Sequence, residues 1–152
     1  ADAYQNLVNR HAGLTSYNRI GWWRWVNGDT EGAIEMMTRA ARAGKPNSEP
    51  TAWVLTELGH LHRKAGNLAE AERAFNAALQ QFPRMHAAWA GLGETYAAQD
   101  KRKEAIQALQ KAQAIAPMVE YAGLLADFYT QQGDTQAANK QLQLVDLQAT
   151  ME

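Results

Sequence analysis

An internal repeat with a period of 34 residues is the feature that most constrains the fold of this chain. Residues 52–83 align without a gap with residues 86–117. The matched pairs are Leu58 with Leu92, Gly59 with Gly93, Ala71 with Ala105, Phe75 with Leu109, Ala78 with Ala112, and Pro83 with Pro117. A unit this small cannot bury its apolar face alone. The period therefore predicts a row of units that stack on one another and share a core.

The same pattern extends in both directions along the chain. Gly21 precedes Gly59 by 38 residues, so the upstream unit is followed by a longer linker, "GKPNSEP". We expect one continuous domain of four units, at residues 14–47, 52–85, 86–118 and 119–152. Residues 1–13 are expected to be the second helix of a truncated upstream repeat. Because solenoid ends need polar caps, we also expect further repeats or another domain beyond one end or both.

Each unit is predicted to be a pair of helices joined by a tight turn. The turns contain "NGDT", "AGNL" and "QGDT", in which glycine supplies a left-handed residue that ends the first helix. The next polar residue, Asp29, Asn67 or Asp134, is expected to cap the second helix, and Asn67 with Glu70 fits a capping box. The third unit has Asp100 and Lys101 instead, so its turn is less sharply specified. Pro46, Pro83 and Pro117 are expected to stop the second helices.

Small residues recur at one position in each helix. Gly21, Gly59 and Gly93 lie in the middle of first helices, where glycine costs about 1 kcal/mol relative to alanine. That cost is tolerable if the missing side chain lets two helix backbones approach closely. The matching small residues of the second helices are Ala33, Ala71, Ala105 and Ala138. We therefore expect the two helices of each unit to contact each other at these positions.

With these residues in place, the sequence resembles the tetratricopeptide repeat family. The signature residues are Tyr17, Gly21, Ala33, Gly59, Ala71, Phe75, Pro83, Trp89, Gly93, Tyr96, Ala105 and Pro117. The resemblance covers residues 14 to about 150. It implies an all-α fold, a right-handed superhelix of antiparallel helix pairs whose first helices line a concave groove. It also implies a non-enzymatic scaffold that holds a peptide or helix of a partner protein in that groove.

Three of the five tryptophans lie in "GWWRW", residues 21–25. Trp22 and Trp25 are three residues apart and share one side of a helix, whereas Trp23 is expected to pack on the second helix of its own unit. Trp89 is expected in the core. By resemblance, the groove would be lined by Asn18, Trp22, Trp25, Trp53, Thr56, His60, Arg63, Glu94 and Asp127. The alternative for Trp22 and Trp25 is structural packing, since apolar stripes are core by default.

Other kinds of function find little support in the sequence. The net charge of −1 offers no electrostatic excess for nucleic acid or anionic lipid, and no apolar run is long enough to span a bilayer. The chain has no cysteine, and His60 and His62 point to opposite sides of a helix, so we expect no metal or other cofactor. We find no nucleophile, phosphate-loop or zincin motif and expect no enzyme activity. An RNA-binding helical repeat is a minor alternative. We expect a soluble protein of the cytoplasm or periplasm.

The leading hypothesis is a protein–protein interaction scaffold that captures an extended or helical segment of a partner. In some tetratricopeptide proteins a lysine–asparagine clamp binds a carboxylate terminus. Trp22, His60, Ala90 and Glu94 stand at those positions here, so we do not expect that specificity. The alternative is a structural or regulatory segment of a larger protein, or a module that self-associates through its terminal repeats. The exposed leucines predicted for residues 136–150 favour self-association.

Overall fold

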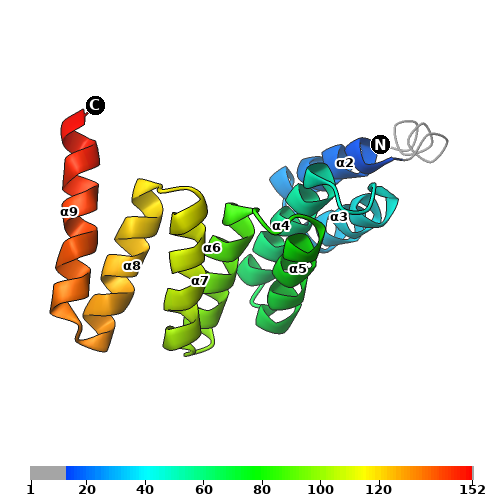
Figure 1. Cartoon of the computed structure of the whole chain (residues 1–152). Helices are drawn as coiled ribbons and strands as arrows, with labels where there is room; N and C mark the ends of the chain where they lie inside the picture. The colour runs from blue at the N-terminus through cyan, green and yellow to red at the C-terminus, as the bar shows by residue number, and fades with distance from the viewer. Residues whose placement is uncertain (1–12, 152) are drawn as a thin grey trace. The chain divides into compact units, whose positions relative to one another are not determined.

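The structure is a computed structural model that describes residues 13–151. Within this range it contains eight α-helices and no strand. The helices are α2 (Leu14–Val26), α3 (Thr30–Ala43), α4 (Glu49–Lys64), α5 (Leu68–Gln81), α6 (His86–Ala98), α7 (Arg102–Ile115), α8 (Val119–Gln132) and α9 (Thr135–Met151) (Figure 1). The helix expected over residues 1–13 lies outside the described residues, except for Gly13. The second pair begins at Glu49, three residues before the predicted start of that unit.

The helices pack as consecutive antiparallel pairs: α2 with α3, α4 with α5, α6 with α7, and α8 with α9 (Figure 1). They belong to two compact units, one that ends at Met85 and one that begins at His86. Within the first unit α3 also contacts α4, and within the second α7 contacts α8. Within each compact unit, one helix pair therefore covers the next, as expected for helix pairs that cannot bury their apolar faces alone. The predicted all-α fold of helix pairs is confirmed.

The glycine turns have the predicted conformation. Gly28, Gly66 and Gly133 all have φ of 83°, the left-handed region in which a side chain is strained. Asp29 and Asp134 then accept hydrogen bonds from backbone amides at the start of the next helix, at 2.9 Å from Gly32 N and 3.1 Å from Ala137 N. These caps satisfy amide groups that have no partner inside the helix.

Two other turns differ in detail. Asn67 precedes α5 but makes no side-chain cap hydrogen bond, so the predicted capping box with Glu70 is wrong. Glu70 instead forms an ion pair with Arg73 at 3.2 Å, one helical turn along α5. In the third turn Asp100 takes the left-handed position with φ of 60°, because the backbone reverses there without a glycine. Aspartate is among the few residue types that tolerate this conformation.

The mid-helix glycines mark close contacts between paired helices, as predicted. A Cβ atom added at Gly59 would lie 2.6 Å from Cε1 of Phe75, which is fully buried. At Gly93 it would lie 2.9 Å from Cγ of Leu109 and 3.2 Å from the Ala105 carbonyl oxygen. At Gly21 the nearest atom would be Met37 Cγ at 2.8 Å. A side chain at any of these positions would force atoms of the facing helix to shift.

Each unit has its own core. In the first unit the largest cluster joins residues of α3, α4 and α5, namely Ala33, Met37, Ala40, Val54, Leu58, Leu61 and Ala74. In the second it joins residues of α6, α7 and α8, and Trp89 and Tyr96 pack against it as predicted. Only Ala138 of α9 is buried. The prolines act as expected, since Phe82 and Ala116, immediately before Pro83 and Pro117, are extended and end α5 and α7.

Candidate functional site

The described residues of the first unit form a cleft on the side of the first helices, α2 and α4. Its volume is about 320 Å³. It is lined by Trp22, Trp25, Met37, Trp53, Glu57, His60, Leu61, Arg63 and Lys64. Trp22, Trp25, Trp53, His60 and Arg63 were among the predicted groove residues, and the structure brings them together in one concave surface. We call this surface the tryptophan cleft.

Helical spacing explains why these side chains share one surface. Trp22 and Trp25 are three residues apart on α2. On α4, Trp53, Glu57, His60 and Lys64 follow one another at intervals of three or four residues and form a single stripe. Glu57 belongs to this stripe but was not among the groove residues predicted from the sequence. It could have been predicted from its position four residues after Trp53 on the same expected helix.

The tryptophans of the first unit differ in exposure. Trp22 is 45% exposed and Trp53 is 50% exposed, so both keep a large apolar area in contact with solvent. Trp25 is half-buried and packs against the core of the first unit, while the ammonium group of Lys64 lies 5.1 Å from the centre of its ring. Trp25 therefore combines the two roles considered for it, since it supports the core and also lines the cleft.

The prediction for Trp23 is wrong. Trp23 is 61% exposed, more than Trp22 or Trp53, and it does not line the cleft. Ile20 packs with Met36 of α3, Gly21 approaches Met37, and both Ile20 and Gly21 are buried. At about 100° per residue, Trp23 lies roughly 60° from Ile20 but roughly 160° from Gly21, so it stands at the edge of the contact with α3 and stays exposed.

Glu57 holds a desolvated carboxyl group at the aromatic end of the cleft. The indole Nε1–H of Trp22 donates a hydrogen bond of 3.2 Å to Glu57 Oε1. Glu57 Oε2 is shielded from solvent and has no hydrogen-bond partner of good geometry among the described residues. Burial raises the pKa of Glu57, and the nearby donors of Trp22, Trp53 and Asn18 offset part of that rise. Asn18, a predicted groove residue, therefore lies beside Glu57 but does not line the cleft.

The other end of the cleft is basic. Arg63 Nη2 lies 3.4 Å from Nδ1 of His60, and the His60 ring meets Phe75 edge to face at 5.1 Å. Burial, together with the positive charges of Arg63 and Lys64, lowers the pKa of His60 to about 4. His60 is therefore neutral at pH 7, and the positive charge at this end comes from Arg63 and Lys64.

Three predicted groove residues lie elsewhere. Thr56 is only 2% exposed, and its hydroxyl donates a hydrogen bond of 2.8 Å to the Ala52 carbonyl, so it faces the interior and not the cleft. Glu94 on α6 is half-buried and Asp127 on α8 is exposed. Both belong to the second unit and are not among the residues that line the tryptophan cleft.

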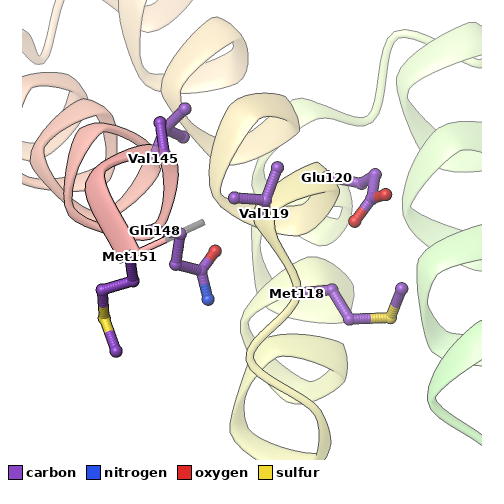
Figure 2. A pocket seen from close by; sticks show the side chains of 7 residues that line it. Met118, Val119, Glu120, Val145, Gln148 and Met151 are labelled. Carbon is purple, nitrogen blue, oxygen red and sulfur yellow. The ribbon is translucent and has the colours of Figure 1, made fainter.

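A second hollow lies in the other unit, between the start of α8 and the end of α9. Its volume is about 570 Å³, and it is lined by Met118, Val119, Glu120, Val145, Gln148, Ala149 and Met151. Figure 2 shows Val119 on α8 and Val145 and Gln148 on α9 along its sides. Leu142, Leu144, Leu147 and Met151 of α9 are all more than 40% exposed. The prediction that α9 leaves its apolar side chains uncovered is confirmed for the described residues.

Among residues 13–151, no group of three or more histidine, aspartate or glutamate side chains could hold a metal ion. No helix in this part of the chain is long and apolar enough to cross a membrane.

Comparison with known proteins identifies the helix pairs. Residues 56–120 match a tetratricopeptide repeat family model. A solved structure of MamA superposes with a TM-score of 0.84 at 18% identity, over 99% of this chain and 86% of that one. The MamA RS-1 ArsTM double mutant gives a TM-score of 0.77 at 19% identity, over 91% and 77%. BtubC (BKLC) from P. vanneervenii gives 0.81 at 19% identity, over 91% and 64%.

These structures share the fold of this chain at low sequence identity. A comparison with curated protein sequences found no match. The family match falls on α4 to α8, where the glycine, alanine and proline positions of the repeat were recognised in the sequence. Residues 56–120 therefore belong to the tetratricopeptide repeat family, and the chain has the helical-repeat fold of tetratricopeptide proteins.

Proposed function

We propose that this protein is a non-catalytic interaction scaffold whose tryptophan cleft binds a segment of a partner protein. The tetratricopeptide fold supports a role as a protein-interaction scaffold in general. The observation that carries the more specific proposal is the pair Trp22 and Trp53, two half-exposed indoles that line the same cleft. Tryptophan is strongly enriched among residues that dominate binding energy at interfaces.

The physical argument rests on exposed apolar area. A tryptophan side chain offers a large contact surface, and each 100 Å² of apolar area removed from water contributes about 2.5 kcal/mol. Trp22 and Trp53 are not part of the core cluster of the first unit, nor among the partly buried residues packed against it. A partner that covers both indoles gains this contribution, whereas an isolated chain leaves them in water. The cleft walls on α2 and α4 are helical and therefore rigid before binding.

The test compares two tryptophan variants. Peptides are selected from a random display library on the wild-type protein and then measured against Trp22→Ala/Trp53→Ala. We expect affinity to fall at least about tenfold, because truncation of one interface hot spot costs about 2 kcal/mol or more. Trp23→Ala is the matched control, since Trp23 is also an exposed tryptophan on α2 but does not line the cleft.

Circular dichroism and thermal denaturation establish that each variant remains folded. Selected peptides that bind the double variant as tightly as the wild type would contradict the proposal. A library that yields no binder at all would do the same.

A second candidate is self-association through α9. The specific observation is the exposure of Leu142, Leu144 and Leu147 on α9, the helix that also forms one side of the hollow. Exposed apolar patches of this kind mark interfaces. Light scattering of the full chain between micromolar and millimolar concentration should then show a concentration-dependent dimer that Leu144→Asp/Leu147→Asp abolishes. A strict monomer over this range would exclude the second candidate and leave the cleft proposal unaffected.

A further inference from the structure

We infer that the aromatic end of the tryptophan cleft, formed by Trp22, Trp53 and Glu57, receives a basic side chain of the partner segment. This inference rests on the proposed function and adds the chemistry of the group that binds there. An arginine or lysine of the partner would lie against the exposed indole faces, above the carboxylate of Glu57.

The first step concerns the charge on Glu57. Trp22 on α2 donates its indole N–H to Glu57 on α4 at 3.2 Å, across 35 positions of sequence. The second carboxylate oxygen is shielded from solvent and has no partner of good geometry among the residues described. Within the cleft lining, the cationic side chains Arg63 and Lys64 are six and seven residues further along α4. An ionised Glu57 therefore keeps a negative charge that is not fully compensated, either by water at Oε2 or by an adjacent cation among the described residues.

The raised pKa of Glu57 agrees with this description. Burial disfavours the ionised carboxylate, and the surrounding donors counteract only part of that effect. A cation held beside the indoles would favour ionisation. Binding of a basic group and loss of the Glu57 proton are therefore expected to support each other.

The second step concerns the indole faces. The face of an aromatic ring carries partial negative charge and attracts cations, and tryptophan does so most strongly. Donation of the Trp22 N–H to a carboxylate increases the electron density of that ring. The cleft already contains one such contact, because the Lys64 ammonium lies 5.1 Å from the centre of Trp25. Trp22 and Trp53 are 45% and 50% exposed and offer comparable surfaces to a partner.

The opposite end of the cleft carries two positive charges, on Arg63 and Lys64. Arg63 and Lys64 follow Glu57 on α4 by about two helical turns, which corresponds to a distance of about 10 Å along the axis. Salt reduces the repulsion of the bound cation across that distance, since solvent-exposed charges more than about 8 Å apart are largely screened at physiological ionic strength. The same two side chains would attract an acidic residue. An extended partner advances about 3.3 Å per residue, so we expect its basic and acidic residues to be about three positions apart.

The experiment uses the peptides selected on the wild-type chain. The sequences should be enriched in arginine or lysine, and the basic residue is replaced by a neutral residue of similar shape, citrulline for arginine or acetyl-lysine for lysine. We expect this replacement to weaken binding about 5–30-fold, the range of a partly desolvated cation–π contact. Glu57→Gln should weaken binding of the original peptide by a similar factor, but it should have little further effect on the neutral peptide. Glu49→Gln, an exposed residue at the start of the same helix, is the matched control.

The outcomes separate this inference from the proposed function. Peptides that require Trp22 and Trp53 but tolerate both the neutral replacement and Glu57→Gln would overturn the basic-group inference and leave the cleft as a binding site. Peptides that do not depend on the two tryptophans, or the absence of any binder, would overturn both. The neutral-peptide measurement is made on the wild-type protein, so the result does not depend on whether Glu57→Gln folds.

Discussion

At the scale of single residues, the three tryptophans of α2 show how one side chain is used in different ways within one helical turn. Trp25 packs partly on the core of the first unit, Trp22 bonds to Glu57 at the cleft, and Trp23 is mostly exposed. The chemistry of the residue is the same in each case. Each tryptophan contributes differently to stability and to binding because its side chain points in a different direction from the helix and contacts different atoms.

These differences lead to a prediction about stability. Trp25→Ala should lower the free energy of unfolding by about 1–3 kcal/mol, less than the 3–5 kcal/mol of a fully buried tryptophan because Trp25 is only half-buried. Trp23→Ala should change it by less than about 0.5 kcal/mol. Urea denaturation followed by circular dichroism measures both values. Equal losses for the two variants would show that Trp25 does not support the core.

His60 provides a prediction about pH. Its folded-state pKa of about 4 is below its ordinary value of 6.5, because of burial and of the charges on Arg63 and Lys64. As pH falls below 6.5, the unfolded chain binds a proton that the folded chain refuses, so stability is complete above pH 6.5 and decreases toward pH 4. The loss should be on the order of 1–2 kcal/mol, reduced from the full linkage value because His60 is partly exposed.

The matched variant for this measurement is His60→Gln. The variant should lose less stability than the wild type between pH 6.5 and pH 4 in urea titrations at each pH. Two neighbours contribute to both proteins: burial lowers the pKa of His62, which acts in the same direction, and raises the pKa of Glu57, which acts in the opposite one. The difference between the two curves therefore isolates His60. Parallel curves would contradict the assignment.

At the scale of helices, two glycines of the second unit differ in what they contact. Gly93 on α6 faces Leu109 and the Ala105 backbone on α7, whereas a Cβ added at Gly123 on α8 would meet nothing within 4 Å. Both are within helices, where alanine is favoured over glycine by about 1 kcal/mol. Helix propensity alone therefore predicts that alanine stabilises both sites. Packing should reverse the sign at Gly93.

We therefore expect Gly93→Ala to lower the free energy of unfolding by about 1–2 kcal/mol, and Gly123→Ala to raise it by about 0.5–1 kcal/mol. Gly93→Leu, a larger side chain, should cost about 1–3 kcal/mol or more. Denaturant melts of the three variants provide the comparison. Stabilisation by Gly93→Ala would mean that α6 and α7 do not approach each other as closely as the structure shows.

At the scale of the whole molecule, stability is expected to vary along the chain. The core of the second unit consists of residues from α6, α7 and α8, and the only buried residue of α9 is Ala138. In a protein built from repeated pairs, each element is stabilised mainly by its neighbours. Helix α9 packs on α8 and, among the described helices, has no following helix to cover its leucines.

Hydrogen exchange tests this gradient. Amides of residues 142–151 in α9 should exchange through local opening at a much lower free energy than amides of residues 105–112 in α7, which should require the largest opening of the second unit. The expected difference is at least about tenfold in protection factor. Uniform protection of α7 and α9 in the monomer would indicate that α9 is covered by contacts that the described residues do not show.

The sequence by itself determined the features that depend on local spacing. The 34-residue period, the positive-φ glycines at Gly28, Gly66 and Gly133, and the glycine contacts of paired helices could all be predicted, because each follows from residues within one unit. The same reasoning placed Trp22 and Trp53 on the first helices. It also predicted exposed leucines on α9, which the described residues show.

Only the tertiary structure decided which side chains meet between helices. Helical phase places a residue to within a broad arc, but burial depends on which neighbour covers that arc. For that reason Thr56 is buried, Trp23 is exposed and Asn67 leaves its helix uncapped, contrary to expectation. The bond between Trp22 and Glu57 joins residues 35 positions apart on two helices. The spacing of residues within a single repeat cannot predict that contact, because the contact depends on how one helix pair packs against the next.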